Sequence, residues 1–271
     1  MKDRSIAFVG AGNMARSLIR GLLASGTPPE RLCAADPDAA QREQLAALGV
    51  PVLEDNAVAI GGADVVVLAV KPQVMAAVLR PLPIATGQLV ISIAAGLPLS
   101  ALEAWTPAGT AIVRCMPNTP ALLGAGITGL FANAAVTPEQ KDAAERILSA
   151  AGRTLWVPEE SALDAVTAVS GSGPAYFFYL MEAMIEAGEA LGLDHDTAVT
   201  LTLETAYGAA RMAREGGEPP AVLRANVTSP GGTTERALSI LDAAGVRDTV
   251  RQAVAGAAAR ARELAEELGR P

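Results

Sequence analysis

The chain has 271 residues, of which 51% are apolar and only 3% aromatic, so it can fill one large or two ordinary cores with Ala, Val, Leu and Ile. Its formal net charge of −8 argues against nucleic acids and anionic membranes as partners, because an acidic surface repels phosphate groups. No apolar run is long enough to span a bilayer, and the charged start of the chain resembles neither a signal peptide nor a transit sequence. We therefore expect a cytoplasmic protein.

Short β-type runs alternate with helical patterns in the first part of the chain. Strands are expected over Ser5–Val9, Leu32–Ala35, Val65–Val70, Leu89–Ile93, Ala111–Cys115, Gly126–Phe131 and Thr154–Val157. Helices are expected over Asn13–Ser25, Asp38–Leu48 and Glu139–Ala150. Because most of these strands are almost wholly apolar and are separated by helices, the pattern predicts an α/β domain with a mostly parallel sheet covered on both faces.

Strand patterns end near Pro158, and helical periodicity dominates the rest of the chain. It covers Ala175–Leu191, Asp196–Glu215 and Gly245–Leu268. We therefore predict a sheet domain over residues 1–160 and an all-α domain over residues 161–271.

The predicted helices of the second domain are apolar on more than one side. One of them carries a broad apolar arc made by Val199, Leu201, Leu203, Tyr207, Ala210 and Met212. Small helical domains with wide apolar faces usually bury them against a partner, so we expect at least a homodimer. A tightly packed monomeric bundle is the alternative.

A glycine-rich turn follows the first predicted strand and opens a helix. It reads Gly10-Ala11-Gly12-Asn13-Met14-Ala15, which is the GxGxxA pattern in the context that dinucleotide binding requires. Gly10 permits the tight turn, Gly12 lets a pyrophosphate approach the backbone, and Ala15 lets the helix lie close to the strand. The free N–H groups of the helix start then face the phosphates.

Asp36 ends the second predicted strand, at the distance past the glycine turn where dinucleotide-binding domains carry an acidic residue. Its carboxylate would hold a ribose 2′-hydroxyl and repel a 2′-phosphate, which favours NAD over NADP. The alternative is a plain helix N-cap before Pro37.

Three further strand ends are candidate parts of the dinucleotide site, because doubly wound sheets bind ligands at the carboxyl ends of their strands. Lys71 would present a cation or an amide, or it is an exposed lysine at a helix start. The small residues Ala94, Ala95 and Gly96 would let a nicotinamide ring lie against backbone. Asn118 would bind the carboxamide or would order its proline-rich loop.

A second glycine turn interrupts the helical domain. It reads Asn226-Val227-Thr228-Ser229-Pro230-Gly231-Gly232-Thr233-Thr234 and runs into a helix. Its hydroxyls and free backbone N–H groups at a helix start predict an anion site that a small carboxylate can reach. The alternative is a helix–helix connection with a Ser or Thr N-cap.

The segment Ser170–Tyr176, SGSGPAY, has two interpretations. Gly171 and Gly173 would allow close approach of another chain or a ligand, or the segment is a simple loop-to-helix start with Pro174 in the first turn.

The remaining reactive side chains predict no metal or thiol chemistry. Cys33 and Cys115 lie in apolar runs without a CxxC pattern, which indicates buried, reduced thiols. His195 is the sole histidine and is expected at the surface, so a multi-histidine metal site is excluded.

At this point the chain resembles one family over nearly its full length. GAGNMA at Gly10, LAVKPQ at Leu68, RCMPNTPA at Arg114, SGSGPAY at Ser170 and NVTSPGGTT at Asn226 are similar in order and content to the motifs of pyrroline-5-carboxylate reductase. The last motif is the most specific. The resemblance implies a Rossmann domain followed by a helical dimerisation domain, larger rings of dimers, and reduction of Δ1-pyrroline-5-carboxylate to L-proline with NADPH or NADH.

The resemblance also implies roles for individual residues. The nucleotide would be contacted by the glycine turn, by Asn56, and by the strand end formed by Ala69, Val70, Lys71 and Pro72. Ala94 and Ala95 would border the nicotinamide. The substrate carboxylate would be held by Ser229, Gly231, Gly232 and Thr233, with Asn226 near both ligands, and Thr234 would be the catalytic residue that hydrogen-bonds the ring nitrogen. Asp36 departs from family members that bind NADPH.

Two other functions remain open at this stage. A β-hydroxyacid dehydrogenase would share the architecture but needs a lysine in the helical domain, and the three lysines, Lys2, Lys71 and Lys141, all lie outside it. A non-catalytic dinucleotide sensor would keep the first glycine turn but has no need of the second.

Overall fold

The structure is a computed structural model and describes residues 4–269. The first three residues, which belong to the charged start of the chain and include Lys2, lie outside the described part. The chain forms two compact units, residues 4–172 together with 257–269, and residues 173–256. We propose that the domain boundary lies at about residue 160.

The first unit is built on one eight-stranded sheet in the order β3-β2-β1-β4-β5-β6-β7-β8. All neighbouring strands are parallel except β6 and β7, which are antiparallel. The predicted mostly parallel sheet is therefore confirmed. The strands are β1 (Ile6–Val9), β2 (Leu32–Ala35), β3 (Val52–Leu53), β4 (Val65–Leu68), β5 (Leu89–Ser92), β6 (Ala111–Met116), β7 (Gly126–Ala132) and β8 (Gly152–Trp156).

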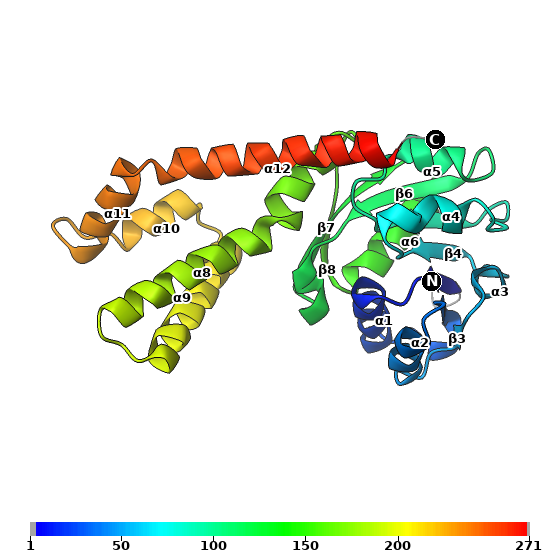
Figure 1. Cartoon of the computed structure of the whole chain (residues 1–271), viewed down its shortest axis with the longest axis horizontal. Helices are drawn as coiled ribbons and strands as arrows, with labels where there is room; N and C mark the ends of the chain where they lie inside the picture. The colour runs from blue at the N-terminus through cyan, green and yellow to red at the C-terminus, as the bar shows by residue number, and fades with distance from the viewer. Residues whose placement is uncertain (1–3, 270–271) are drawn as a thin grey trace. The chain divides into compact units, whose positions relative to one another are not determined.

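Helices cover both faces of this sheet (Figure 1). One face packs against α1 (Asn13–Ala24), α2 (Ala39–Ala46) and α6 (Pro138–Ser149). The other packs against α3 (Asn56–Ile60), α4 (Met75–Leu79), α5 (Leu99–Ala104) and the end of α12 (Val246–Leu268). The alternation along β1 shows why both faces are apolar: Ile6 and Phe8 face the first layer and Ala7 and Val9 the second.

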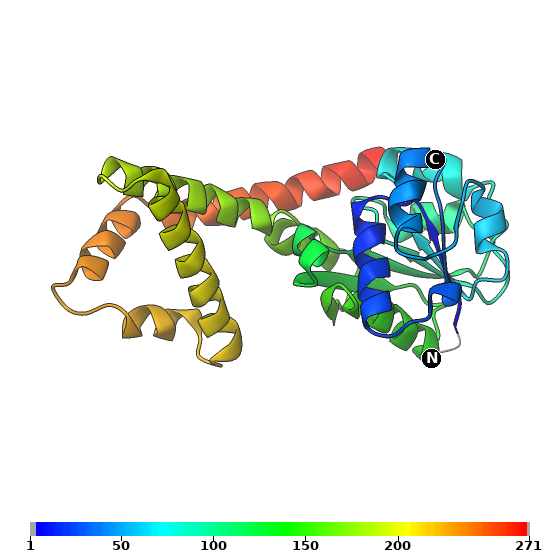
Figure 2. The same cartoon turned by 90° about the horizontal axis from the view of Figure 1, so that it is seen from below.

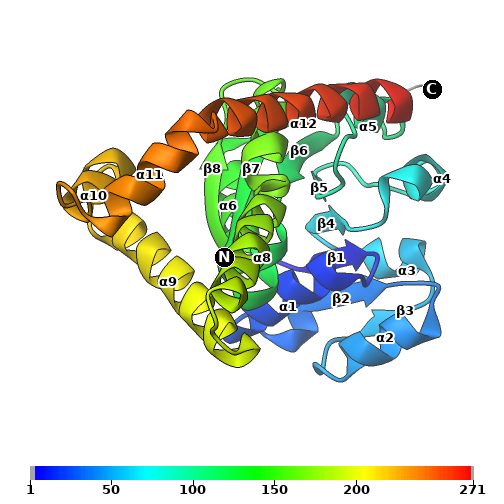
Figure 3. The ribbon, with the colours of Figure 1, turned by 60° about the vertical axis from the view of Figure 1, so that its left-hand side comes forward.

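The second unit consists of helices alone. α8 (Gly173–Ala190) and α9 (His195–Glu215) form a helical hairpin, followed by α10 (Pro220–Asn226), α11 (Thr233–Ala243) and the first part of α12. Figure 2 shows α9, α10 and α11 in yellow to orange, following one another without stacking into a bundle. Figure 3 shows the same succession from another side.

This unit has almost no core of its own. Between residues 173 and 256 only Gly173, Ala198 and Thr202 are buried. Large apolar side chains are exposed instead, among them Phe177 at 65% and Tyr179 at 76%. A tightly packed monomeric bundle is therefore wrong, because these helices bury too little surface to be stable alone, and the unit needs a partner surface.

The structure contains elements that the sequence patterns did not predict. These are the two-residue strand β3, the short helices α3, α4, α5, α7 (Ala162–Val166) and α10, a π-helical turn at Thr167–Gly171, and 3-10 turns such as η2 (Pro72–Val74) and η3 (Thr119–Leu123). Elements this short carry too little periodicity to be recognised.

Candidate active site

The predicted cofactor residues gather at one edge of the sheet, because they follow neighbouring parallel strands that end in register. The amide of Gly10 donates to the carbonyl oxygen of Ala35 at 2.8 Å, and that of Ala69 donates to Val9 at 2.8 Å. The amide of Ile93 donates to Leu68 at 3.2 Å. The segments after β1, β2, β4 and β5 therefore lie side by side at the carboxyl edge, where open α/β sheets bind their ligands.

The glycine turn after β1 has the geometry that its sequence requires. Gly10 has φ +99°, and a Cβ there would lie 2.8 Å from the carbonyl oxygen of Ala69, so no other residue fits. A Cβ on Gly12, the N-cap of α1, would meet nothing within 4 Å. Ala15 is fully buried against the sheet. The turn thus leaves open space directly at a helix N-terminus, as a pyrophosphate needs.

Asp36 is joined to the glycine turn. Its Oδ2 accepts a hydrogen bond from the amide of Ala11 at 2.8 Å, and its Oδ1 accepts one from the amide of Asp38 at 2.9 Å. The N-cap of α2 is Asp38, whose side chain accepts from Ala40, so Asp36 is not the helix cap. Its carboxylate is instead hydrogen-bonded to the glycine turn.

Asn56, at the start of α3, shows that the edge suits a dinucleotide. Its side-chain Oδ1 is buried and has no hydrogen-bond partner within residues 4–269. An unpaired buried acceptor is costly, and a ribose hydroxyl would supply the missing donor. The unpaired oxygen, the open space at Gly12 and the Asp36 carboxylate together fit the ribose and phosphates of NAD(P).

Other predicted contacts around this edge differ in exposure. Lys71 is an exposed residue at the start of the 3-10 turn η2. After β5, Ala94 is buried, Ala95 is exposed, and Gly96 has φ +74°.

Asn118, in the loop after β6, connects strand β7 with the π-helical turn at Thr167–Gly171. Its Oδ1 accepts from the amide of Ile127 at 2.9 Å, and its Nδ2 donates to the carbonyl oxygen of Ser170 at 3.1 Å. These bonds support the interpretation in which Asn118 orders its own loop. Next to it, a Cβ on Gly171 would lie 2.5 Å from Cε of Met116, so the close approach at this glycine comes from the chain itself.

The second glycine turn lies in the second unit, between α10 and α11. Gly231 has φ +69°, Gly232 is the N-cap of α11, and Thr233 and Thr234 are the first residues of the helix. The N–H groups of the first helical turn point out of the helix, as an anion site requires.

Three hydroxyl groups of this turn are unengaged. Within the described part of the chain, the side chains of Ser229, Thr233 and Thr234 form no hydrogen bond, whereas Thr228 donates to the carbonyl oxygen of Arg224 at 2.6 Å. The Ser or Thr N-cap of the alternative interpretation is not found, since the N-cap of α11 is Gly232 and the helix has no side-chain cap bond. The turn therefore offers free donors for a small anion.

One carboxylate already contacts this turn. The amide of Gly231 donates to Oε2 of Glu235 at 2.8 Å. Nearby, Nδ2 of Asn226 donates to Oε2 of Glu218 at 3.3 Å. The pattern TTE in the first turn of a helix is the local signal that could have identified Glu235.

An ion pair that the sequence did not reveal lies close to the cofactor edge. Arg114 of β6, with a side chain only 8% exposed, lies 2.6 Å from Oε1 of Glu160. The same oxygen accepts the amide of Leu99 at 2.7 Å. No local pattern could have paired residues so far apart in the chain.

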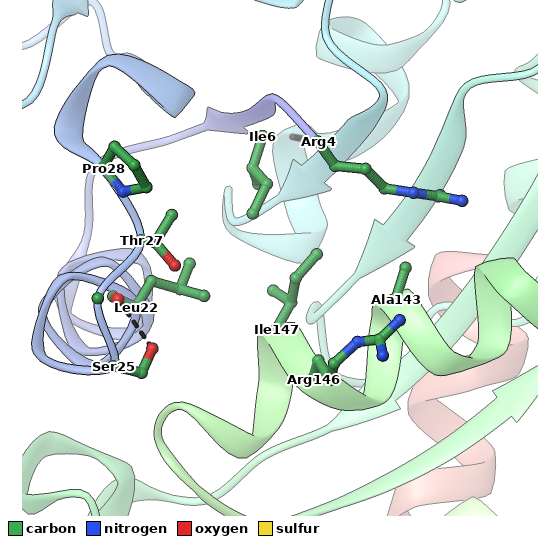
Figure 4. A pocket seen from close by; sticks show the side chains of 10 residues that line it. Arg4, Ile6, Leu22, Ser25, Thr27, Pro28, Ala143, Arg146 and Ile147 are labelled. Atoms are coloured by element: carbon green, nitrogen blue, oxygen red, sulfur yellow. Dashed lines mark hydrogen bonds between the residues drawn. The ribbon is translucent and has the colours of Figure 1, made fainter. Parts of the chain in front are cut away.

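A pocket of about 290 Å³ lies between α1, α6 and the start of β1 (Figure 4). Apolar side chains and two arginines, Arg4 and Arg146, line it. It contains none of the predicted site residues, and it lies at the amino edge of the sheet, away from the glycine turn. It is not the candidate active site.

The other reactive groups lie apart from both turns. Burial raises the pKa of the Cys115 thiol far above its usual range, and it also raises the pKa of Cys33. His195 is exposed and pairs with Glu189 at 2.6 Å, which raises the pKa of its imidazole. No set of three or more metal-ligating side chains, and no helix able to cross a bilayer, occurs within residues 4–269.

A mostly parallel sheet with a nucleotide cradle at its carboxyl edge, followed by a helical unit without its own core, defines a dinucleotide-dependent oxidoreductase with an association domain. Family models agree. Residues 5–96 match the model described as NADP oxidoreductase, coenzyme F420-dependent, and residues 160–264 match pyrroline-5-carboxylate reductase dimerisation.

Relatives and solved structures match the whole chain. The pyrroline-5-carboxylate reductase of Pseudomonas aeruginosa is 54% identical, over 99% of this chain and 100% of that protein. A solved reductase of this name from Coxiella burnetii has a TM-score of 0.93 at 44% identity, covering 96% of this chain and 98% of that one. The Plasmodium falciparum enzyme with NADP bound has a TM-score of 0.86 at 29% identity, over 98% and 99%.

The chain belongs to the pyrroline-5-carboxylate reductase family. It is an NAD(P)-dependent oxidoreductase with a small-molecule substrate, and its dimerisation domain makes it a homo-oligomer. The dehydrogenase and sensor alternatives are thereby set aside.

Proposed function

We propose that the chain reduces Δ1-pyrroline-5-carboxylate to L-proline, the last step of proline biosynthesis, with NADPH or NADH as the hydride donor. Membership of the family, shown by near-full-length relatives, is the observation that carries this proposal. A homodimer, larger rings of dimers, and a cytoplasmic location remain predictions that accompany it.

In this proposal the first unit holds the dinucleotide. The turn from Gly10 to Ala15 takes the pyrophosphate, Asp36 and Asn56 take ribose hydroxyls, and the segments Ala69–Pro72 and Ala94–Gly96 line the rest of the cleft. Asn118 belongs to the same edge. When bound, the dinucleotide supplies the hydride.

The turn before α11 would hold the substrate. The turn formed by Ser229, Gly231, Gly232 and Thr233 would bind the carboxylate at the positive end of the helix, with the hydroxyls of Ser229 and Thr233 as donors. Asn226 would lie near both ligands.

Thr234 would act on the ring nitrogen. Its hydroxyl, which forms no hydrogen bond within residues 4–269, would hydrogen-bond the nitrogen and orient the imine. An imine protonated before binding is already electrophilic at carbon, so the protein need only align the reactants and compensate charge. The single histidine, exposed and far along the chain from either turn, is not required.

The experiment is a kinetic comparison of the purified protein with its Thr234→Ala variant. We expect oxidation of NAD(P)H that depends on the cyclic imine, and a fall in turnover of about tenfold to a hundredfold for the variant, with cofactor affinity retained. Unchanged kinetics would remove Thr234 from the mechanism. Cofactor binding without imine-dependent turnover in the parent protein would overturn the proposed function itself.

A further inference from the structure

In the proposed function, the loop after β5 borders the nicotinamide ring. It runs through Ala94, Ala95 and Gly96 to Pro98, the N-cap of α5. Ala95 is exposed, and Gly96 has a left-handed φ of +74°. A loop with such small side chains cannot hold its shape through its own packing, so its supports must come from elsewhere.

The first support is the carboxylate of Glu160. Its Oε1 accepts the amide of Leu99, directly after the loop, at 2.7 Å and the guanidinium of Arg114 at 2.6 Å. The side chain of Arg114 is 8% exposed and that of Glu160 is 29% exposed. Charge-assisted bonds of this kind are strong, and losing one partner would leave a buried charge uncompensated. One oxygen atom thereby ties the end of the loop to β6.

The second support is the last part of α12, which belongs to the first unit. A Cβ on Gly96 would lie 3.4 Å from Cδ1 of Leu268 and 3.5 Å from Cβ of Leu264, so the helix touches the loop directly. Leu268 also packs against the cluster that contains Leu97 and Leu99. Figures 1 and 3 both show the end of α12 beside α5.

We propose that Glu160, Leu264 and Leu268 are positioning residues for hydride transfer. Because the amide of Leu99 is hydrogen-bonded to Glu160 and Gly96 is covered by α12, the loop presents one fixed surface to the nicotinamide ring. The loop thereby sets the distance over which the hydride moves. This inference rests on the proposed function. None of the three residues touches the substrate in that proposal.

Changes at these residues should affect the rate of hydride transfer more than the affinity for the cofactor. In the proposed function the glycine turn and Asp36 would hold the adenosine and phosphate part of the dinucleotide, and neither Glu160 nor Leu268 belongs to that turn. Loosening the loop should therefore leave cofactor affinity nearly unchanged. Hydride transfer should suffer, because a displacement of about 1 Å can cost on the order of a hundredfold in rate.

The experiment compares Leu268→Ala, Glu160→Ala and Glu160→Gln with two matched controls. Glu266→Ala makes an exposed change on the same turn of α12, and Glu159→Gln alters the exposed neighbour of Glu160. Three quantities are measured: NAD(P)H affinity by fluorescence titration, kcat with the cyclic imine, and the isotope effect with cofactor deuterated at the transferred position.

For Leu268→Ala and Glu160→Ala we expect kcat to fall about tenfold or more, with an isotope effect that rises toward its intrinsic value and a cofactor Kd within about twofold of the parent. Glu160→Gln keeps an oxygen acceptor, so its kcat should lie between those of the two alanine variants and that of the parent. Both controls should match the parent.

The outcomes separate this inference from the proposed function. If the parent protein does not reduce the imine, the proposed function fails. If the parent is active and folded Leu268→Ala keeps parental kcat and isotope effect, only the positioning role is overturned. A parallel loss of kcat and cofactor affinity would also overturn it, since that pattern indicates general destabilisation. Should Glu160→Ala not fold, Leu268→Ala decides.

Discussion

The carboxylate of Asp36 accepts the amide of Ala11 at 2.8 Å, so the acidic end of β2 and the glycine turn after β1 form one structure. The guanidinium of Arg42 lies beside them and donates to the carbonyl oxygens of Asp36 and Pro37 at 2.8 Å each. If the glycine turn binds the dinucleotide as proposed, the Asp36 carboxylate would lie near the ribose 2′ position, with the positive charge of Arg42 next to it.

Asp36→Ser should shift the cofactor preference toward NADPH. Two like charges about 4 Å apart repel by roughly 1–4 kcal/mol in the surroundings of a protein surface, and removing the carboxylate leaves Arg42 available to the phosphate. We expect the ratio of kcat/KM for NADPH over NADH to rise at least about tenfold. Steady-state kinetics with both cofactors measures it.

The control for this prediction is Glu43→Gln, which removes an exposed carboxylate from α2 without touching the turn. It should leave the ratio unchanged. A ratio that stays constant in Asp36→Ser would show that Asp36 does not select the cofactor.

Glu235 should compete with the substrate carboxylate for the turn before α11, because its Oε2 already accepts the amide of Gly231 at 2.8 Å. Glu235→Gln keeps an acceptor but removes the repelling charge, which is worth on the order of 1 kcal/mol in water-like surroundings. We expect KM for the imine to fall about twofold to tenfold, with kcat and the melting temperature little changed.

Glu186→Gln, an exposed change on α8, is the control and should behave as the parent. A higher KM in Glu235→Gln would contradict the expectation and would mean that the charged carboxylate supports the turn.

Leu203 and Tyr207 of α9 should lie in a subunit interface. They are four residues apart and so share one face of the helix, and they are 46% and 61% exposed in the single chain. Leu203→Asp combined with Tyr207→Asp would place two charges in an apolar contact, which costs several kcal/mol. Sedimentation should show dissociation into monomers, together with loss of stability.

Gln44→Asp adds an acidic side chain to the exposed surface of α2 and should leave the oligomer intact. An unchanged assembly in the double variant would exclude this face of α9 from the interface.

The two thiols should differ in reactivity at pH 8. Burial raises the pKa of both, so little of either is thiolate, but Cys115 is fully buried whereas Cys33 is only partly so. With a thiol-specific disulfide reagent we expect slow labelling of Cys33, and labelling of Cys115 only after denaturation. Cys33→Ser should abolish the reaction in the native protein, and rapid labelling of Cys115 would contradict its burial.

The sequence alone determined the order of the main strands and helices, because apolar runs such as Val65–Leu68 and the glycine turn at Gly10 carry their own local signals. It also indicated both glycine turns, since glycine and hydroxyl residues at helix starts are local features. The short elements β3, α3 and α5 escaped prediction because they have too few residues for periodicity.

Only the tertiary structure decided which distant groups meet. Glu160 reaches Leu99 and Arg114 across the chain, and Asn118 reaches Ser170. In the part of the chain that the structure describes, the side-chain oxygen of Asn56 has no hydrogen-bond partner. The near absence of a core in residues 173–256 is likewise a property of packing. Burial and pairing depend on how segments far apart in sequence fold against each other, and no local pattern contains that information.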